Sequence, residues 1–257
     1  MKYVKNYLKL INEGISYNEE LDEFEFNWQG DLPDDLINLK LQRYNRYLSL
    51  KKGTQLYYAY KFNKKIDSLL KRKLVTGIKY ANSTQIDSHD LNLLLSKSIN
   101  SFNQLEPLST FDIIVFPKSS STILDLLKLK LSAKAGLNTQ VASDLFVKNT
   151  IDNIQLDTTK LQALSEENRE KVLSIINRIL SKDQFKLRSI PPQYRKFITN
   201  FLSFNSKTER RIFNAIIDGK VLIVDDILTE GTALSNMTRL LENIGANSTT
   251  GFILLSN

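Results

Sequence analysis

The sequence lacks cysteine altogether, so the chain has no disulfide bond, no thiolate metal ligand and no cysteine nucleophile. It has one histidine, His89, in the polar stretch DSHDL, where we expect a neighbour of a helix cap rather than a catalyst. No stretch approaches the ~18 apolar residues of a membrane helix, and the first residues lack the apolar segment of a signal peptide. These absences lead us to expect a cytoplasmic protein with no membrane partner.

The charge of the chain is unbalanced towards lysine and arginine. Its 257 residues carry a formal net charge of +7, and the pI is about 9.3. A basic protein favours a polyanionic partner, either a phosphorylated small molecule or a nucleic acid. The alternative is that the lysines only reflect a Lys-, Asn- and Ile-rich composition. The net charge alone does not distinguish a polyanionic partner from this bias in composition.

The N-terminal part changes sign of charge along its length. The first forty residues are locally acidic and contain FEFNW, which alternates like a short strand. From Lys40 to Lys73 basic residues are interleaved with tyrosines, a pattern that can track a nucleic-acid backbone and stack on bases. We favour a plainer interpretation, a strand and a helix whose tyrosines are packed, because no cleanly basic face emerges.

From Phe111 onward the pattern predicts an α/β fold. FDIIVF predicts a buried strand, STILDLLKLKLSAKAG a helix ending at Gly136, and QVASDLFV a second strand. Helical spacing then runs from Thr159 to Asn205, with Thr159 and Gln162 at the spacing of a capping box. A strand at 221–224, a helix at 233–243 and a final strand at 251–255 follow. Alternating strands and helices predict a mostly parallel sheet flanked by helices, with ligands bound at the carboxyl ends of its strands.

The most informative stretch is GKVLIVDDILTEGTAL, residues 219–234. Four apolar residues predict a strand buried on both faces, and Asp225 and Asp226 follow it. A loop of Thr229, Glu230, Gly231, Thr232 and Ala233 then leads into a helix. A helix N-terminus binds phosphate, glycine allows close approach, and hydroxyls add donors. The aspartates can accept hydrogen bonds from vicinal hydroxyls, so the stretch predicts a site for a phosphorylated sugar.

Residues 221–233 closely resemble the signature of type I phosphoribosyltransferases. The resemblance implies that Asp225 and Asp226 hold the ribose hydroxyls of phosphoribosyl pyrophosphate and that residues 229–233 cradle its 5-phosphate. DIIVFPKSSS resembles the first core strand and its pyrophosphate loop, here Pro117, Lys118, Ser119 and Ser120. Lys148 stands where the family places a basic residue beside the mobile catalytic loop. The implied cofactor is Mg²⁺, held mainly by the substrate.

The resemblance also implies a division of the chain. Residues 1–105 would form an N-terminal extension and hood-like region, and residues 106–257 the phosphoribosyltransferase-like core with a helical insert at about 155–205. YYAY and LVTGIKY, upstream, resemble the ComF-type subgroup, although the zinc-binding segment of that subgroup is excluded by the absence of cysteine. The implied activity, in nucleotide metabolism, is transfer of the phosphoribosyl group to a nitrogen acceptor with release of pyrophosphate.

Several departures from the family pattern support a second hypothesis. Glu230 places an anion in the phosphate loop, and the pyrophosphate loop has neither glycine nor arginine. The insert is long, and the chain ends straight after the last strand, so we expect no C-terminal hood over a base. The alternative is a non-catalytic protein that uses the fold for nucleotide or phosphate binding, regulation or assembly, for example in a phage or bacterial complex. The acceptor, a homo-oligomer and a nucleic-acid or protein partner for Lys40–Lys73 stay open.

Overall fold

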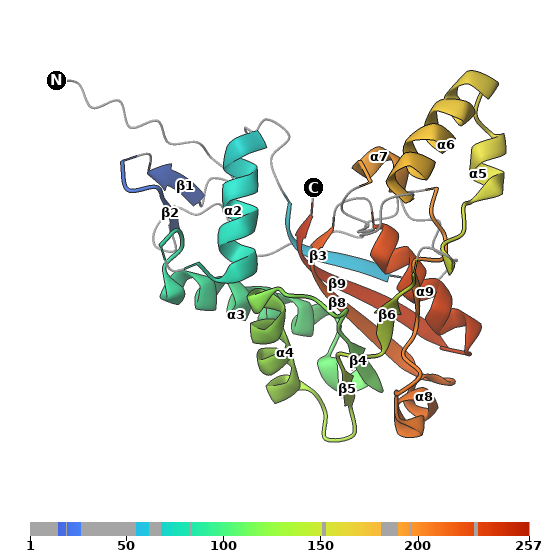
Figure 1. The fold of residues 1–257 in the computed structure, drawn as a ribbon. Helices are drawn as coiled ribbons and strands as arrows, with labels where there is room; N and C mark the ends of the chain where they lie inside the picture. Colours follow the sequence, from blue (N-terminus) through green and yellow to red (C-terminus); the bar gives the residue numbers. More distant parts are fainter. Residues whose placement is uncertain are drawn as a thin grey trace.

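A computed structural model describes the chain at residues 15–18, 20–26, 55–61, 68–82, 84–150, 153–180, 190–195, 197–228 and 231–256. Its centre is a five-stranded sheet in which every neighbouring pair is parallel (Figure 1). The strands lie in the order β3 (Gln55–Lys61), β9 (Ser248–Ser256), β8 (Lys220–Leu228), β4 (Ile113–Val115) and β5 (Gln140–Ala142). The predicted α/β class with a mostly parallel sheet is confirmed.

The path of the chain reverses between β4 and β8. From β4 it passes through helix α4 (Thr122–Lys134) to β5, towards one edge of the sheet. From β8 it passes through α9 (Thr232–Asn243) to β9, in the other direction. In open parallel sheets the crevice between two such strands, at their carboxyl ends, is where ligands bind. The fold therefore marks the ends of β4 and β8 as the place to look for a site.

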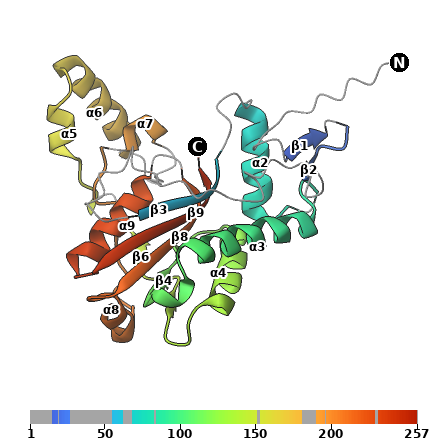
Figure 2. The same cartoon turned by 180° about the vertical axis from the view of Figure 1, so that it is seen from behind.

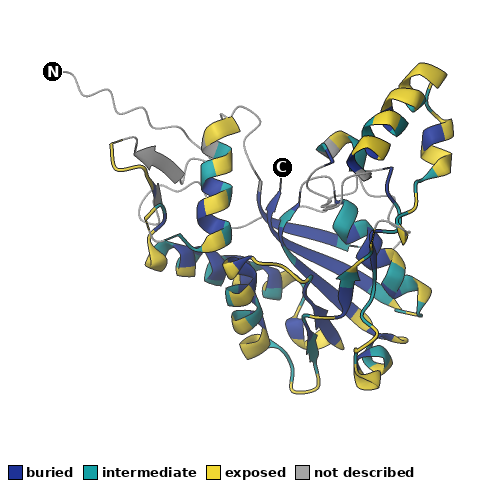
Figure 3. Ribbon diagram, viewed as in Figure 1, coloured by how far each residue is buried: buried dark blue, intermediate teal, exposed yellow. Residues whose placement is uncertain are grey.

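Helices cover both faces of the sheet. On one face α2 (Ser68–Tyr80), α3 (Ser88–Leu105) and α4 pack against the buried side chains of Leu222 and Val224, with the short turn η1 (Leu108–Thr110) alongside. On the other face α8 (Arg210–Ile216) and α9 pack against Val221 and Ile223. The view from behind shows the two layers (Figure 2), and the strands between them are almost wholly buried (Figure 3). Because both faces of these strands are buried, their sequences are uninterrupted runs of apolar residues.

Two predicted elements are divided differently in the structure. QVASDLFV does not form a single strand of the main sheet: β5 belongs to that sheet, but β6 (Phe146–Lys148) pairs antiparallel with β7 (Leu202–Phe204). Asn205, directly after β7, stabilises the turn between β5 and β6, because its side-chain amide nitrogen donates to the carbonyl oxygen of Asp144 at 3.0 Å. The helical pattern predicted as far as Asn205 is wrong at its end, where β7 lies.

The described part of the insert before β7 contains three helices, as predicted: α5 (Thr158–Gln162), α6 (Glu166–Leu180) and α7 (Pro192–Arg195). The predicted capping box is wrong, since Thr159 lies inside α5 and the cap is Asp157, which accepts a hydrogen bond from the N–H of Lys160. Leu161, Val172, Ile176 and Phe197 form a small apolar cluster of their own, while most of α5 and α6 is exposed (Figure 3).

The N-terminal region shares the core of the molecule. Strand β3 forms one edge of the central sheet, so residues 1–105 and 106–257 contribute to one sheet and one apolar cluster. Tyr57, Tyr58 and Tyr60 are buried in β3, which removes them as stacking platforms for nucleic-acid bases. Other parts of the Lys40–Lys73 stretch, residues 40–54 and 62–67, lie outside the described residues.

Smaller N-terminal elements agree with the sequence patterns. FEFNW contributes β2 (Glu23–Phe26), which forms a hairpin with β1 (Ile15–Asn18). The carboxylate of Asp87 caps α3 and accepts the N–H of His89 at 2.7 Å, so His89 is a cap neighbour as expected. Across the described part of the chain no helix is both long and apolar enough to cross a membrane.

Candidate functional site

The two aspartates lie within β8 rather than after it. The strand was predicted to end at Val224, but it continues to Leu228, and Asp225 pairs in register with Ile253 of β9. On the other side β4 ends at Val115, opposite Ile223. Both aspartates therefore stand beyond the carboxyl end of β4, at the reversal point of the sheet.

The side chain of Asp226 points towards α2, and both aspartates line the same pocket. Oδ2 of Asp226 lies near Nζ of Lys79 in α2. The regular alternation of side chains along β8 does not continue past Val224, because Ile227 packs against the same apolar cluster as Val224. The backbone N–H of Asp226 donates a hydrogen bond of 2.9 Å to the carboxylate of Asp225, and the two carboxyl groups lie close enough to interact directly.

The environment of Asp225 favours its protonated form. Burial raises the pKa of the Asp225 carboxyl well above its ordinary range, and the adjacent Asp226 carboxylate raises it further. The hydrogen bond from the Asp226 N–H and the charge of Lys79 oppose these effects without cancelling them. The pair thus differs from two solvated carboxylates, because one of them holds a proton more readily than an ordinary aspartate.

Asp226 is almost completely buried and is paired with a lysine from the N-terminal region. It is 5% exposed, and its Oδ2 lies 3.6 Å from Nζ of Lys79 in the last turn of α2. The two side chains form an ion pair, but at this distance they do not form a hydrogen bond. Within the described part of the chain, Oδ2 has no hydrogen-bond partner.

Gly231 occupies the N-cap of α9 in the left-handed region, with φ of 66° and ψ of 11°. Glycine adopts this conformation without strain, which explains its place at the turn from β8 into α9. Thr232 begins the helix, and its buried Oγ1 has no hydrogen-bond partner among the described residues. Ala233 follows. Thr229 and Glu230, the other members of the predicted 5-phosphate loop, lie outside those residues.

The predicted pyrophosphate loop, Pro117 to Ser120, connects β4 with α4. Lys118, Ser119 and Ser120 are exposed, and the Oγ of Ser119 accepts the N–H of Ser121 at 3.2 Å. Ser121 is buried and does not cap α4 with its side chain; its hydroxyl donates instead to the carbonyl oxygen of Lys79. The loop is therefore joined to the end of α2, the helix that carries the partner of Asp226.

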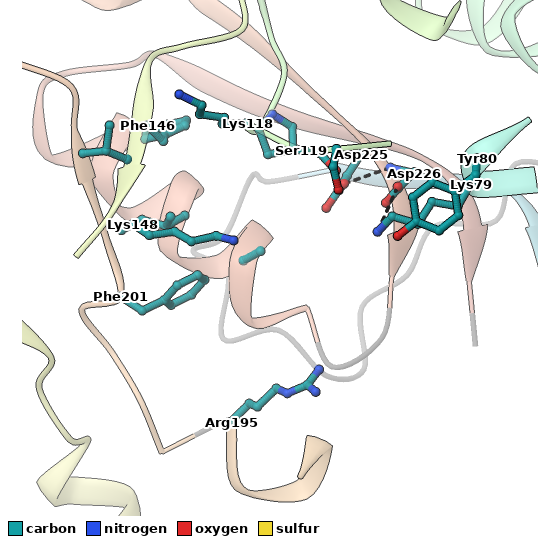
Figure 4. A pocket seen from close by; sticks show the side chains of 15 residues that line it. Lys79, Tyr80, Lys118, Ser119, Phe146, Lys148, Arg195, Phe201, Asp225 and Asp226 are labelled. Carbon is teal, nitrogen blue, oxygen red and sulfur yellow. Dashed lines mark hydrogen bonds and ion pairs between the residues drawn. The ribbon is translucent and has the colours of Figure 1, made fainter. Parts of the chain in front are cut away.

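A pocket of about 990 Å³ brings these elements together (Figure 4). It is lined by both aspartates, by all four residues 117–120, by Lys148 of β6 and by Ala233. Lys148 extends into the same space as Arg195 of α7. Segments that are far apart in the chain thus meet at the reversal point, and the sequence had predicted residues 117–120, Lys148, both aspartates and Ala233 as site residues.

Other lining residues were not predicted as site residues. They are Lys79, Tyr80, Phe146, Val147, Arg195, Phe201 and Leu202. Lys79 and Tyr80 belong to LVTGIKY, which the sequence marked only through a resemblance. Arg195 follows Pro191 and Pro192, which predicted a break between helices but not its direction. No local pattern identifies these residues, because only the packing of α2 and α7 brings them to the pocket.

The donor set suits a metal held chiefly by a ligand. In the described ranges no group of three or more histidine, aspartate or glutamate side chains could enclose a metal ion. Two carboxylates and the hydroxyls of Ser119 and Ser120 line the pocket. Mg²⁺ is commonly bound through one or two carboxylates together with substrate phosphates, so these residues fit it in that manner.

Comparisons with known proteins give little further guidance. No protein-family model matches the chain, and no curated protein matches it. Among solved structures it is similar to the "allosteric regulatory enzyme of purine biosynthesis", with a TM-score of 0.35 and 13% identity. That match covers 70% of this chain but only 30% of the other. A likeness of this degree establishes neither a shared fold nor a shared activity.

Proposed function

We propose that the protein binds phosphoribosyl pyrophosphate, or another 5-phosphorylated ribose, and transfers the phosphoribosyl group to a nitrogen acceptor. The proposal includes a type I phosphoribosyltransferase-like core for residues 106–257. In the reaction the bond between C1 of the ribose and the pyrophosphate oxygen breaks, and a bond from C1 to the acceptor nitrogen forms. The acceptor loses a proton, and pyrophosphate leaves.

One observation carries this proposal: a carboxylate pair, a glycine-capped helix N-terminus and a lysine- and serine-bearing loop line or adjoin a single pocket. Each suits one part of the ligand. Carboxylates accept hydrogen bonds from vicinal hydroxyls, helix N-termini hold phosphate, and a lysine with hydroxyls holds a second anionic group. All three meet at the reversal point of the sheet, where α/β proteins bind their ligands.

In this mechanism the chain positions its substrate more than it reacts with it. Asp225 and Asp226 orient the ribose, the segment from Gly231 to Ala233 anchors the 5-phosphate, and Lys118 with Lys148 offsets negative charge on the leaving group. When bound, Mg²⁺ neutralises charge on the pyrophosphate; Asp225, Asp226, Ser119 and Ser120 are the residues that would hold it beside the phosphates. The apolar side chains of Phe146 and Phe201 in the wall limit access of water.

The test is a calorimetric titration of the full chain with phosphoribosyl pyrophosphate and magnesium, followed by an assay for pyrophosphate release in the presence of candidate amines and bases. Binding with saturable release supports the enzyme. Binding without release supports the second hypothesis, a non-catalytic phosphate- or nucleotide-binding protein. The absence of arginine from the 117–120 loop is the observation that favours this alternative, because bidentate phosphate contacts are lost. If the parent protein fails to bind at millimolar ligand, the proposal is overturned.

A further inference from the structure

The ion pair between α2 and β8 carries an inference that rests on the proposed function and extends it to the N-terminal region. We infer that Lys79 is a positioning residue, which holds the carboxylate of Asp226 correctly directed for the ribose hydroxyls. The predicted site residues all lie at Pro117 or later in the chain. The structure places one of the determinants of the site in the preceding region.

Lys79 faces the side chain of Asp226. Nζ of Lys79 lies 3.6 Å from Oδ2 of Asp226, and both residues line the pocket together with Asp225. A sugar ring can contact both aspartates only if Asp226 is held towards the pocket rather than within the apolar layer of α2, α3 and α4. The Lys79 side chain is 30% exposed, so it lies at the boundary between that layer and the pocket.

Lys79 is the cation that contacts this carboxylate. Asp226 is 5% exposed, and removing one partner of a buried ion pair leaves the other without compensation. Among the described residues, Lys79 is the one lysine or arginine whose nitrogen lies within 4.0 Å of an Asp226 oxygen. Loss of Lys79 would therefore remove the contact that fixes the direction of the Asp226 side chain.

Lys79 is itself held in place through its backbone. Its carbonyl oxygen accepts the hydroxyl of the buried Ser121, at the start of α4. Ser121 directly follows the 117–120 loop, so the end of α2 is fixed to the segment proposed to hold pyrophosphate. The lysine and the loop form one connected unit, and a change in either affects the position of the other.

The experiment is a double-mutant cycle on the full chain. The variants are Lys79→Met, Lys79→Arg, Asp226→Asn and Lys79→Met with Asp226→Asn, and Lys73→Met is the matched control. Lys73 also lies on α2 and also pairs with an aspartate, Asp22 at 2.7 Å, but it does not line the pocket. Each protein is titrated with phosphoribosyl pyrophosphate plus magnesium and, separately, with inorganic phosphate, and thermal unfolding of the ligand-free proteins is recorded alongside.

We expect Lys79→Met to weaken phosphoribosyl pyrophosphate binding about tenfold, and less than about twofold when Asp226 is already asparagine. Lys79→Arg should keep most of the affinity because it retains the charge, and Lys73→Met should keep all of it. Phosphate binding should be unchanged in every variant. Where the enzyme turns over, the loss should appear in both kcat and KM, since a misdirected carboxylate affects ribose orientation as well as binding.

Three results would overturn the inference while leaving the proposed function standing. The first is a parent and a Lys79→Met variant that bind equally. The second is an equal loss in both Asp226 backgrounds, and the third is a loss of inorganic phosphate binding, which would make Lys79 a direct phosphate ligand. A parent that binds no phosphorylated ribose overturns the proposed function first. In that case coupling seen in the unfolding cycle alone would make the pair purely structural, and the inference would fall with it.

Discussion

The two aspartates of β8 have different surroundings. Asp226 is buried and paired with Lys79, and the surrounding residues belong to a continuous apolar layer. Asp225 is half-buried and is part of a pocket wall shared with Lys148 and Arg195, which β6 and α7 supply from outside the central sheet. One carboxylate is fixed by a close cation, and burial raises the pKa of the other.

The difference shows how a parallel sheet can assign separate tasks to neighbouring residues. Asp225 and Asp226 are adjacent in one strand, yet their environments differ. The end of α2 offers Asp226 a fixed partner, and the pocket beside Asp225 offers room and positive charge. The proposed function needs both, because a ribose must be held still while its anionic substituents are neutralised.

The largest effect is expected from Gly231, on the α9 face. Gly231→Val places a β-branched side chain at φ of 66°, which such residues rarely adopt, and fills the space beside the first N–H groups of α9. We expect phosphoribosyl pyrophosphate affinity to fall by more than about 30-fold, as measured by calorimetry. Gly245→Ala is the control, because Gly245 also has positive φ but lies at the far end of α9. Unchanged affinity in Gly231→Val would remove this loop from the phosphate site.

The next effect separates the aspartates from the phosphate loop. Asp225→Asn together with Asp226→Asn should weaken binding of ribose 5-phosphate about tenfold or more, because charged acceptors form stronger hydrogen bonds than amides. Inorganic phosphate should bind as it does to the parent, since the loop at Gly231 is intact. Asp125→Asn, an exposed position on α4, is the matched control. Equal losses for both ligands would contradict the division of the site.

A smaller effect is expected from the two lysines on the open side. Lys118→Met and Lys148→Met should each weaken phosphoribosyl pyrophosphate about fivefold at low salt, and less at high salt, because exposed charges are screened. Ribose 5-phosphate, which lacks the pyrophosphate, should be affected less. The measurement is a titration at two ionic strengths, with Lys134→Met on the exposed end of α4 as control. A loss independent of both salt and pyrophosphate would show that these lysines do not contact that group.

Much of the central sheet could be predicted from the sequence because its strands and crossover helices carry local patterns. Residues 221–224 are apolar on both faces, and α9 was placed within one residue of its start. The prediction failed where partners are distant in the chain. Strand β7 was taken as part of a helix because LSF is short and gains its structure by pairing with β6. Strand β3 was recognised as a strand but not as an edge of the main sheet.

The same limit applies to the site. Asp225 and Asp226 follow the apolar run 221–224, and residues 117–120 follow the apolar run 113–116. The rule that ligands bind at the carboxyl ends of parallel strands is therefore enough to predict that they come together. Lys79 and Arg195 reach the pocket only because α2 and α7 pack where they do. A basic residue near the end of a helix is common on solvated surfaces, and nothing in its immediate neighbours distinguishes one that enters a site.

The last and smallest expected effect is on the pH dependence of stability, and it concerns Asp225. The pKa of Asp225 is raised in the folded protein by burial and by Asp226, whereas in the unfolded chain it has the usual value of about 4. Between these two pKa values the folded state binds the extra proton, so the stability of the parent falls as pH rises through that window. Asp225→Asn cannot bind a proton there. We therefore expect its free energy of unfolding, relative to the parent, to increase by about 1 kcal/mol between pH 5 and pH 8. Urea unfolding at both pH values measures this, with Asp125→Asn as control. Parallel curves for parent and Asp225→Asn would show that Asp225 does not hold an extra proton in the folded protein.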